Sequence, residues 1–211
     1  TEDHLALLAE CDWICEAIVE NPDIKRDLYR RLEATRKKGS VVSSNTSTIP
    51  LHSLMEGLPE GFQRDFAITH FFNPPRYMRL LEIVGGAKTR PDAVSALHDF
   101  GDRVLGKEVV IAKDTPGFIG NRIGIYWSYI ALSEAFKHGL TVEETDALVG
   151  RPMGIPKTGI FGLVDLTGID LAPHVNESML KLLPKSDPFA QAYDANGPLV
   201  KTIAKLIAEG Y

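Results

Sequence analysis

The sequence predicts an α/β fold over its first half and a mainly helical region after it. Short apolar runs alternate with helical stripes as far as about residue 113. After Asp114-Thr115-Pro116-Gly117 the stripes are helical and strand alternation is rare. Hydrophobic residues make up 44% and charged residues 24% of the 211 residues, as is typical of a globular protein. We therefore expect two domains, residues 1–114 and residues 115–211.

The chain opens with a predicted strand and a well-marked helix. Residues 12–19 form a short apolar run, as expected of a buried strand. A helix start follows, because Asn21 can cap the open amides, Pro22 suits the first turn and Asp23 favours the positive end of the helix dipole. Residues 36–39 (RKKG) supply a basic last turn and a glycine stop.

The remaining elements are predicted from the same patterns. Four more strands are expected, at residues 40–45, 66–72, 80–84 and 109–112, with an amphipathic helix near 91–105. Thr115-Pro116 predicts the start of a long helix over 118–138, which ends at Gly139.

Charge and cysteine content exclude several classes of protein. The 28 acidic residues exceed the 23 basic ones, which argues against nucleic acid as the main partner. No apolar run approaches the roughly 18 residues of a membrane span, and the first residues lack the pattern of a secretory signal. Cys11 and Cys15 fit neither a disulfide framework nor a zinc site. We expect no metal, no membrane partner and a cytoplasmic location.

Familiar phosphate-binding and nucleophile motifs are missing from the sequence. None of the 18 glycines is two positions from another, so there is no G-x-G-x-x-G. The segment 101–107 (GDRVLGK) imitates a P-loop, but Glu108 replaces the magnesium-binding Ser or Thr, and the order is helix then strand, the reverse of a P-loop. Gly-x-Ser-x-Gly, the mark of α/β-hydrolases, is also missing.

A histidine and a carboxylate are predicted to face each other across a hairpin. His70 lies near the C-terminal end of strand 66–72, the edge where open α/β sheets place their chemistry. A carboxylate inside the apolar strand 80–84 is costly unless it has a partner. A hairpin centred on Arg76 pairs Glu82 with His70, close enough to orient the imidazole and raise its basicity. A buried histidine and an edge-facing glutamate with no role are the alternative.

Other polar residues follow strands or begin helices. Residues 43–48 (SSNTST) come after the second strand, and Asn121 lies early in the helix predicted over 118–138. Glu20 and Lys25 flank a strand end and the first turns of a helix. A purely structural role can explain each of these features: a turn for residues 43–48, an exposed helical residue for Asn121, and a surface ion pair for Glu20 and Lys25. No one of them therefore assigns a function by itself.

Six segments taken together carry a more specific signal. They are residues 16–21 (EAIVEN), 44–47 (SNTS), 70–74 (HFFNP), 81–84 (LEIV), 113–122 (KDTPGFIGNR) and 151–154 (RPMG). In order and spacing they resemble the L-3-hydroxyacyl-CoA dehydrogenase family, over essentially the whole chain. Residues 71–77 and Ile155-Pro156-Lys157 look most like the long bacterial members that are fused to an enoyl-CoA hydratase unit.

The resemblance implies NAD-dependent oxidation of L-3-hydroxyacyl-CoA to 3-oxoacyl-CoA in fatty-acid β-oxidation. His70 matches the general base and Glu82 its orienting carboxylate, the two catalytic residues. Ser47 and Asn121 match positions that bind substrate. Positions that bind the cofactor near its nicotinamide are matched by Val19, Glu20, Lys25, Ser47 and Asn73.

The resemblance also implies a fold. Residues 1–114 would be part of a Rossmann (doubly wound) domain that lacks its first βαβ unit, and residues 115–211 the helical domain for substrate binding and dimerisation. Family members begin with a strand, a G-x-G-x-x-G turn and an acidic ribose ligand, none of which this sequence contains. We therefore expect the parent protein to use an acyl-CoA thioester and to form a homodimer, and the isolated chain to be inactive.

Two alternatives remain open at this point. The chain could be an inert structural piece or a helical dimerisation module, or its parent could be a dehydrogenase for another β-hydroxy acid. The presence of both His70 and Glu82 favours an enzyme over a structural module for the parent protein.

Overall fold

A computed structural model of the chain describes residues 2–155 and 157–210. Thr1, Tyr211 and Pro156, the middle residue of the Ile155-Pro156-Lys157 segment, lie outside the described residues. The chain divides into two compact units, Thr1–Ile119 and Gly120–Tyr211, whereas the sequence placed the boundary between residues 114 and 115. Each unit is described by itself below.

The first unit is built on a five-stranded sheet with the order β1-β2-β3-β4-β5. β3 and β4 are antiparallel, and the other neighbours are parallel. The strands are β1 (Trp13–Glu16), β2 (Val41–Ser44), β3 (Phe66–Phe71), β4 (Leu80–Gly85) and β5 (Glu108–Ala112). Each corresponds to a strand predicted from the sequence.

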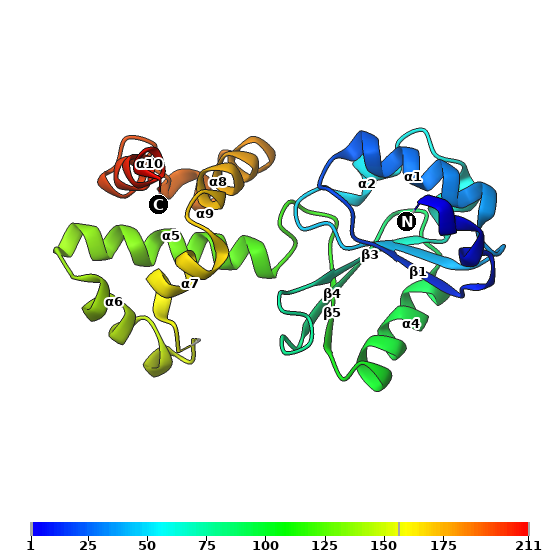
Figure 1. The fold of residues 1–211 in the computed structure, drawn as a ribbon, viewed down its shortest axis with the longest axis horizontal. Helices are drawn as coiled ribbons and strands as arrows, with labels where there is room; N and C mark the ends of the chain where they lie inside the picture. Colours follow the sequence, from blue (N-terminus) through cyan, green and yellow to red (C-terminus); the bar gives the residue numbers. More distant parts are fainter. Residues whose placement is uncertain (1, 156, 211) are drawn as a thin grey trace. The chain divides into compact units, whose positions relative to one another are not determined.

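Helices cover both faces of this sheet (Figure 1). α1 (Pro22–Thr35) and α2 (Leu51–Leu54) lie on one face, and α4 (Pro91–Asp99) lies on the other. The other helical segments of the unit are η1 (Glu2–Glu10), α3 (Glu60–Arg64) and η2 (Phe100–Val104). The arrangement confirms the α/β layers that the alternation of strands and helices predicts.

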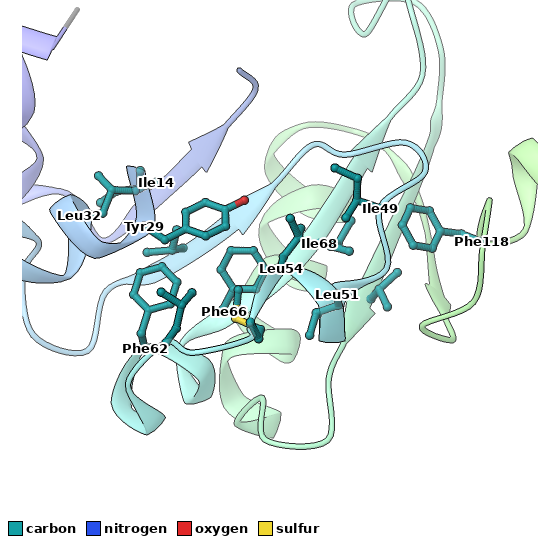
Figure 2. Packing of buried hydrophobic residues seen from close by; sticks show 14 of the residues in the cluster. Ile14, Tyr29, Leu32, Ile49, Leu51, Leu54, Phe62, Phe66, Ile68 and Phe118 are labelled. Atoms are coloured by element: carbon teal, nitrogen blue, oxygen red, sulfur yellow. The ribbon is translucent and has the colours of Figure 1, made fainter. Parts of the chain in front are cut away.

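Aromatic rings fill the space between α1, α3 and the sheet. Tyr29, Phe62 and Phe66 are each 0% exposed, and their ring centroids lie 5.1 to 5.7 Å apart. Figure 2 shows them together with Leu54 and Ile68 in one continuous cluster. Because side chains alternate along a strand, the face of β3 that carries Phe66 and Ile68 also carries His70. The packed core therefore leads directly to the predicted catalytic histidine.

The regular elements described in the second unit are all helices. Its elements are α5 (Gly120–His138), α6 (Val142–Leu148), η3 (Arg151–Met153), α7 (Gly159–Thr167), α8 (Leu171–Leu182), α9 (Pro188–Ala192) and α10 (Pro198–Glu209). Tyr129, Ile160, Met179 and Phe189 are buried at its centre. The sequence prediction of a mainly helical second half is confirmed. Among the described residues of the chain, no helix is both long and apolar enough to cross a membrane.

The start of α1 follows the prediction, while the first strand is shorter than predicted. The Oδ1 atom of Asn21 accepts hydrogen bonds from the backbone N–H groups of Asp23 and Ile24 at 3.0 and 3.2 Å. β1 ends at Glu16, and just beyond it the Ile18 N–H group donates a 2.6 Å hydrogen bond to the Glu16 carboxylate.

The predicted helix start at Thr115-Pro116 is wrong. α5 begins at Gly120, after Gly117 and Phe118, whose φ angles of 70° and 46° are not helical. The Asp114 carboxylate instead binds the start of α2, where it accepts hydrogen bonds of 2.6 and 3.0 Å from the N–H groups of Leu51 and His52. Local sequence suggested a cap, and the residue does cap a helix, but one that lies more than sixty positions earlier in the chain.

Candidate active site

His70 and Glu82 lie opposite each other at the hairpin of β3 and β4. The strand register pairs the two residues directly, as the sequence predicted. The Nδ1 atom of His70 lies 2.7 Å from the Oε2 atom of Glu82. The two side chains are 3% and 0% exposed, so the pair is shielded from water and its electrostatic interaction is strong.

The arrangement orients the imidazole for proton transfer. The second carboxylate oxygen of Glu82, Oε1, accepts a 2.8 Å hydrogen bond from the N–H group of Ile119, which fixes the carboxylate plane. With Nδ1 held by Glu82, Nε2 is the ring nitrogen that can exchange a proton with a bound molecule. A histidine bound in this way can act as a general base whose charged form the carboxylate stabilises.

Two phenylalanine rings hold the histidine from its sides. The ring centroids of Phe72 and Phe118 lie 4.5 and 5.6 Å from that of His70. Phe118 is buried and has a φ angle of 46°, a left-handed conformation that is unusual for a bulky residue. The segment after β5 thus bends sharply to place this ring against the histidine. Sequence reasoning did not single out Phe118, since nothing local marks it as different from other apolar residues.

A second buried group of charges lies where β1 and β2 end. The carboxylate of Glu16 accepts hydrogen bonds from the Lys25 ammonium at 2.7 Å, the Tyr29 hydroxyl at 2.6 Å and the Ser44 hydroxyl at 2.7 Å. Burial, together with the nearby Glu16 carboxylate, raises the pKa of Tyr29, so this hydroxyl stays protonated and donates. Sequence reasoning missed the role of Glu16, which looked like one residue of a buried strand.

Lys25 is buried rather than part of a surface ion pair. Its side chain is 1% exposed, and its ammonium lies 2.7 Å from Glu16 and 3.4 Å from Glu20. It also donates to the carbonyl oxygen of Ile18 at 3.3 Å. The residue therefore joins the end of β1 to the first turns of α1, and reaches the site edge through Glu20.

Glu20 lies in a ring of donors formed by the Ser/Thr-rich segment after β2. Its Oε1 atom accepts hydrogen bonds from the Ser47 and Thr48 N–H groups at 3.0 and 3.2 Å, and from the Thr46 hydroxyl. Partial burial opposes ionisation, but the bond from Thr46 and the charge of Lys25 outweigh it and lower the pKa of Glu20. The carboxylate is therefore charged at neutral pH.

The structure brings most of the predicted site residues to the carboxyl ends of β1, β2 and β3. Val19 is 62% exposed beside Glu20, Ser47 is half-buried, and Asn73 is exposed just beyond β3. Asn45 ties two of these segments together, because its Oδ1 atom accepts a 2.9 Å hydrogen bond from the Phe71 N–H group. Such an edge is where open α/β sheets bind ligands.

Asn121 is the one predicted site residue outside the first unit. It is half-buried in the first turn of α5. The next residue, Arg122, has its Nε atom 3.0 Å from the carboxylate of the buried Asp187, which anchors this turn within the second unit. Among the described residues, no group of three or more His, Cys, Asp or Glu side chains could hold a metal ion.

Two family models match the chain in succession. Residues 1–115 match the NAD binding domain of 3-hydroxyacyl-CoA dehydrogenase, and residues 117–205 match the C-terminal domain of the same enzyme. The resemblance first seen in the six sequence segments is confirmed, as is NAD as the cofactor of the matched domain.

Individual relatives agree with these models. A Deinococcus radiodurans protein named as a 3-hydroxyacyl-CoA dehydrogenase is 43% identical over 188 residues, which are 89% of this chain and 54% of the relative. A Rickettsia prowazekii protein, named as a trifunctional enzyme of a fatty acid oxidation complex, is 38% identical over 91% of this chain and 27% of its own length. The chain thus spans about half the length of the first relative and about a quarter of the second.

A solved structure shows a similar fold. The crystal structure of (S)-3-hydroxybutyryl-CoA dehydrogenase from Ralstonia eutropha has a TM-score of 0.82 to this chain, at 26% sequence identity. The match covers 98% of this chain and 69% of that one.

Proposed function

Because the chain belongs to the 3-hydroxyacyl-CoA dehydrogenase family, we propose that the full-length protein oxidises L-3-hydroxyacyl-CoA to 3-oxoacyl-CoA with NAD⁺ in fatty-acid β-oxidation. The observation that carries this proposal is the buried His70–Glu82 pair at the carboxyl end of β3. A 3-hydroxyl group loses a proton and the hydride of its carbon during this oxidation, so the site needs a base held at a fixed angle.

In the proposed reaction His70 takes the proton of the 3-hydroxyl group at its Nε2 atom. Glu82 stabilises the imidazolium that forms, since it lies 2.7 Å from Nδ1 and is itself fixed by the Ile119 N–H group. When bound, NAD⁺ supplies the acceptor for the hydride that leaves C3. The Phe72 and Phe118 rings exclude water from the histidine.

The residues at the edge of the sheet suit the nicotinamide end of the cofactor. We assign Val19, Glu20, Ser47 and Asn73 to this end, since all four lie just beyond the strands and are at least partly exposed. Lys25 is buried beneath them, and its contact with Glu20 supports a role in holding that carboxylate in place. Ser47 and Asn121 are each proposed to bind the substrate.

We further propose that the helical domain forms a homodimer. A largely apolar groove of about 440 Å³ runs between α5 and α6, with Ile123, Leu148 and Met153 each more than half exposed along it. A second copy of the chain would cover these side chains. Light scattering of Leu148→Glu should show a monomer if this is correct. Leu166→Glu is the control, because Leu166 is 73% exposed and does not line the groove.

The proposal also includes an enoyl-CoA hydratase unit in the same protein and a cytoplasmic location. The trifunctional name of the Rickettsia relative supports a multifunctional protein. Two cysteines that form no disulfide, Cys11 and Cys15, agree with a reducing compartment. Hydration of crotonyl-CoA by the full-length protein tests the first point, and fractionation of its source cells tests the second.

The dehydrogenase proposal is tested by steady-state kinetics. The full-length protein should reduce NAD⁺ with (S)-3-hydroxybutyryl-CoA or a longer homologue, followed by NADH absorbance. Its R enantiomer should react far more slowly, since a fixed base addresses one face of the substrate. If no 3-hydroxyacyl-CoA of short, medium or long chain reduces NAD⁺, the proposed function is wrong.

A further inference from the structure

Lys107 is a buried cation that the proposed mechanism does not use. It ends the 101–107 segment that imitates a P-loop, and β5 starts at the next residue. Lys107 is 9% exposed, and its Nζ atom donates to the carbonyl oxygen of Met78 at 2.7 Å and to that of Pro75. In the described part of the chain no carboxylate lies within ion-pair distance of this ammonium. A charge that is buried in this way normally has a definite structural or functional task.

Both carbonyls belong to an exposed loop that follows the strand of the candidate base. Every residue from 73 to 79 is exposed, so no buried side chain holds the loop in place. The hydrogen bonds within the loop form a turn, in which the Tyr77 and Met78 N–H groups donate to the Pro74 carbonyl at 3.0 and 3.1 Å. Lys107 links this turn to the protein interior, while the last residue of the loop is held by a 2.8 Å hydrogen bond from the Glu108 N–H group to the Arg79 carbonyl.

The lysine also contacts the strand itself. Its Nζ atom lies 5.9 Å from the ring centroid of Phe71, the residue next to His70 in β3. The side chain therefore lies between the base of the loop and the end of the strand, and binds both.

We propose that Lys107 is a positioning residue, which holds the loop 73–79, and with it Asn73, against the cofactor end of the site. The proposal rests on the proposed function, in which Asn73 contacts the nicotinamide. A lysine suits this task, because an ammonium has three N–H donors on a long stem and no acceptor. In a P-loop such donors bind phosphate, whereas here they bind two backbone carbonyls.

The first test follows the loop without any assay of activity. Trypsin cleaves after Arg76 and Arg79, which both lie in the loop. In the full-length protein, Lys107→Met should raise the rate of cleavage at these two sites by about tenfold or more, because the turn at Pro74 to Met78 loses the side chain that ties it to the interior. Lys107→Arg, which keeps a cation with several donors, should be cleaved nearly as slowly as the wild type.

The matched control is Glu108→Gln. It removes the exposed ion pair of Glu108 with Arg79 at the end of the same loop, and leaves the carbonyl contacts of Lys107 intact. This variant should resist trypsin like the wild type. Equal resistance of Lys107→Met would overturn the proposal, as would faster cleavage at sites throughout the chain. If the Met variant does not fold, Lys107→Gln is measured in its place with the same expectations.

The second test asks whether the loop serves the cofactor. For Lys107→Met we expect the KM for NAD⁺ to rise about fivefold or more while kcat changes less than about threefold and its pH profile keeps its shape. A fall in kcat at unchanged KM would refute a positioning role. If the protein oxidises no hydroxyacyl-CoA at all, the kinetic measurement fails but the trypsin result still decides whether Lys107 holds the loop.

Discussion

Replacing Glu82 with glutamine is the most direct test of the candidate catalytic pair. The substitution keeps the size and one acceptor of the side chain but removes the charge that lies 2.7 Å from the Nδ1 atom of His70. Because both side chains are at most 3% exposed, water cannot replace the lost charge. The imidazolium that forms when His70 takes a proton then loses its partner.

The expected loss follows from this geometry. General-base catalysis contributes roughly 10²- to 10⁴-fold to a rate, and His70→Gln should remove all of it. Glu82→Gln should lower kcat by about 10²-fold. If the glutamine amide donates to Nδ1, the ring proton of the neutral histidine lies on Nε2, and Nε2 can then no longer accept the proton of the substrate. As Glu82 acts through His70, the double variant should be about as slow as His70→Gln alone.

The assay is oxidation of (S)-3-hydroxybutyryl-CoA by the full-length protein at saturating NAD⁺. Glu108→Gln on the neighbouring strand β5 is the control, because Glu108 has a side chain that is 69% exposed and takes no part in the site. Urea unfolding of each variant shows whether the fold is kept. A Glu82→Gln enzyme within about threefold of wild type, or a double variant whose loss is the product of the single losses, would refute the reasoning.

Three further predictions concern stability, measured by urea unfolding. Glu20 has a lowered pKa in the folded protein, so its contribution to the free energy of unfolding is complete above the ordinary glutamate pKa and is lost as the pH falls through the folded pKa. Glu20→Gln should be less stable than wild type at neutral pH, and the gap should close as the pH falls below the ordinary glutamate range. A gap that stays constant with pH would contradict this. Tyr29→Phe leaves the buried Glu16 carboxylate with one donor fewer and should cost about 1–3 kcal/mol, whereas the control Tyr77→Phe, at a residue 75% exposed, should stay within about 0.5 kcal/mol. Asn21→Ala removes the cap of α1 and should cost about 1 kcal/mol, while Asn21→Asp should restore most of it; equal stability of the Ala variant would show that the cap is unimportant.

Features that depend on neighbours in the chain could be predicted from the sequence. The strands are short apolar runs between turn residues, so their places follow from local pattern. The facing of His70 and Glu82 could also be predicted, because two consecutive strands that form a hairpin pair about its centre, here Arg76. The same holds for Asn21, whose cap needs only the next three residues.

Features that depend on distant contacts could not be predicted in this way. Asp114 resembles the cap of the following helix, yet its partners are the amides of Leu51 and His52. Lys25 resembles a surface ion-pair partner, yet the fold encloses it between Glu16 and Glu20. In both cases the residue type predicts that the side chain forms charged hydrogen bonds. Its partners, however, lie on segments distant in the sequence, and hydrophobic periodicity does not show which segments pack together.

Three buried charges of the first unit, Glu16, Glu82 and Lys107, share one mode of action. Glu82 binds His70 through one oxygen and the Ile119 N–H group through the other. Glu16 binds Lys25 and also the Ile18 N–H group, and Lys107 donates to two backbone carbonyls. Each charge thus ties the backbone of a segment that carries few buried side chains, with charge-assisted bonds worth about 1.5–3 kcal/mol each. Apolar packing cannot hold such segments at the rim of a site, because the rim must stay open to the cofactor and substrate. Buried charge that reaches outward to the backbone solves this problem at the edge of the candidate site.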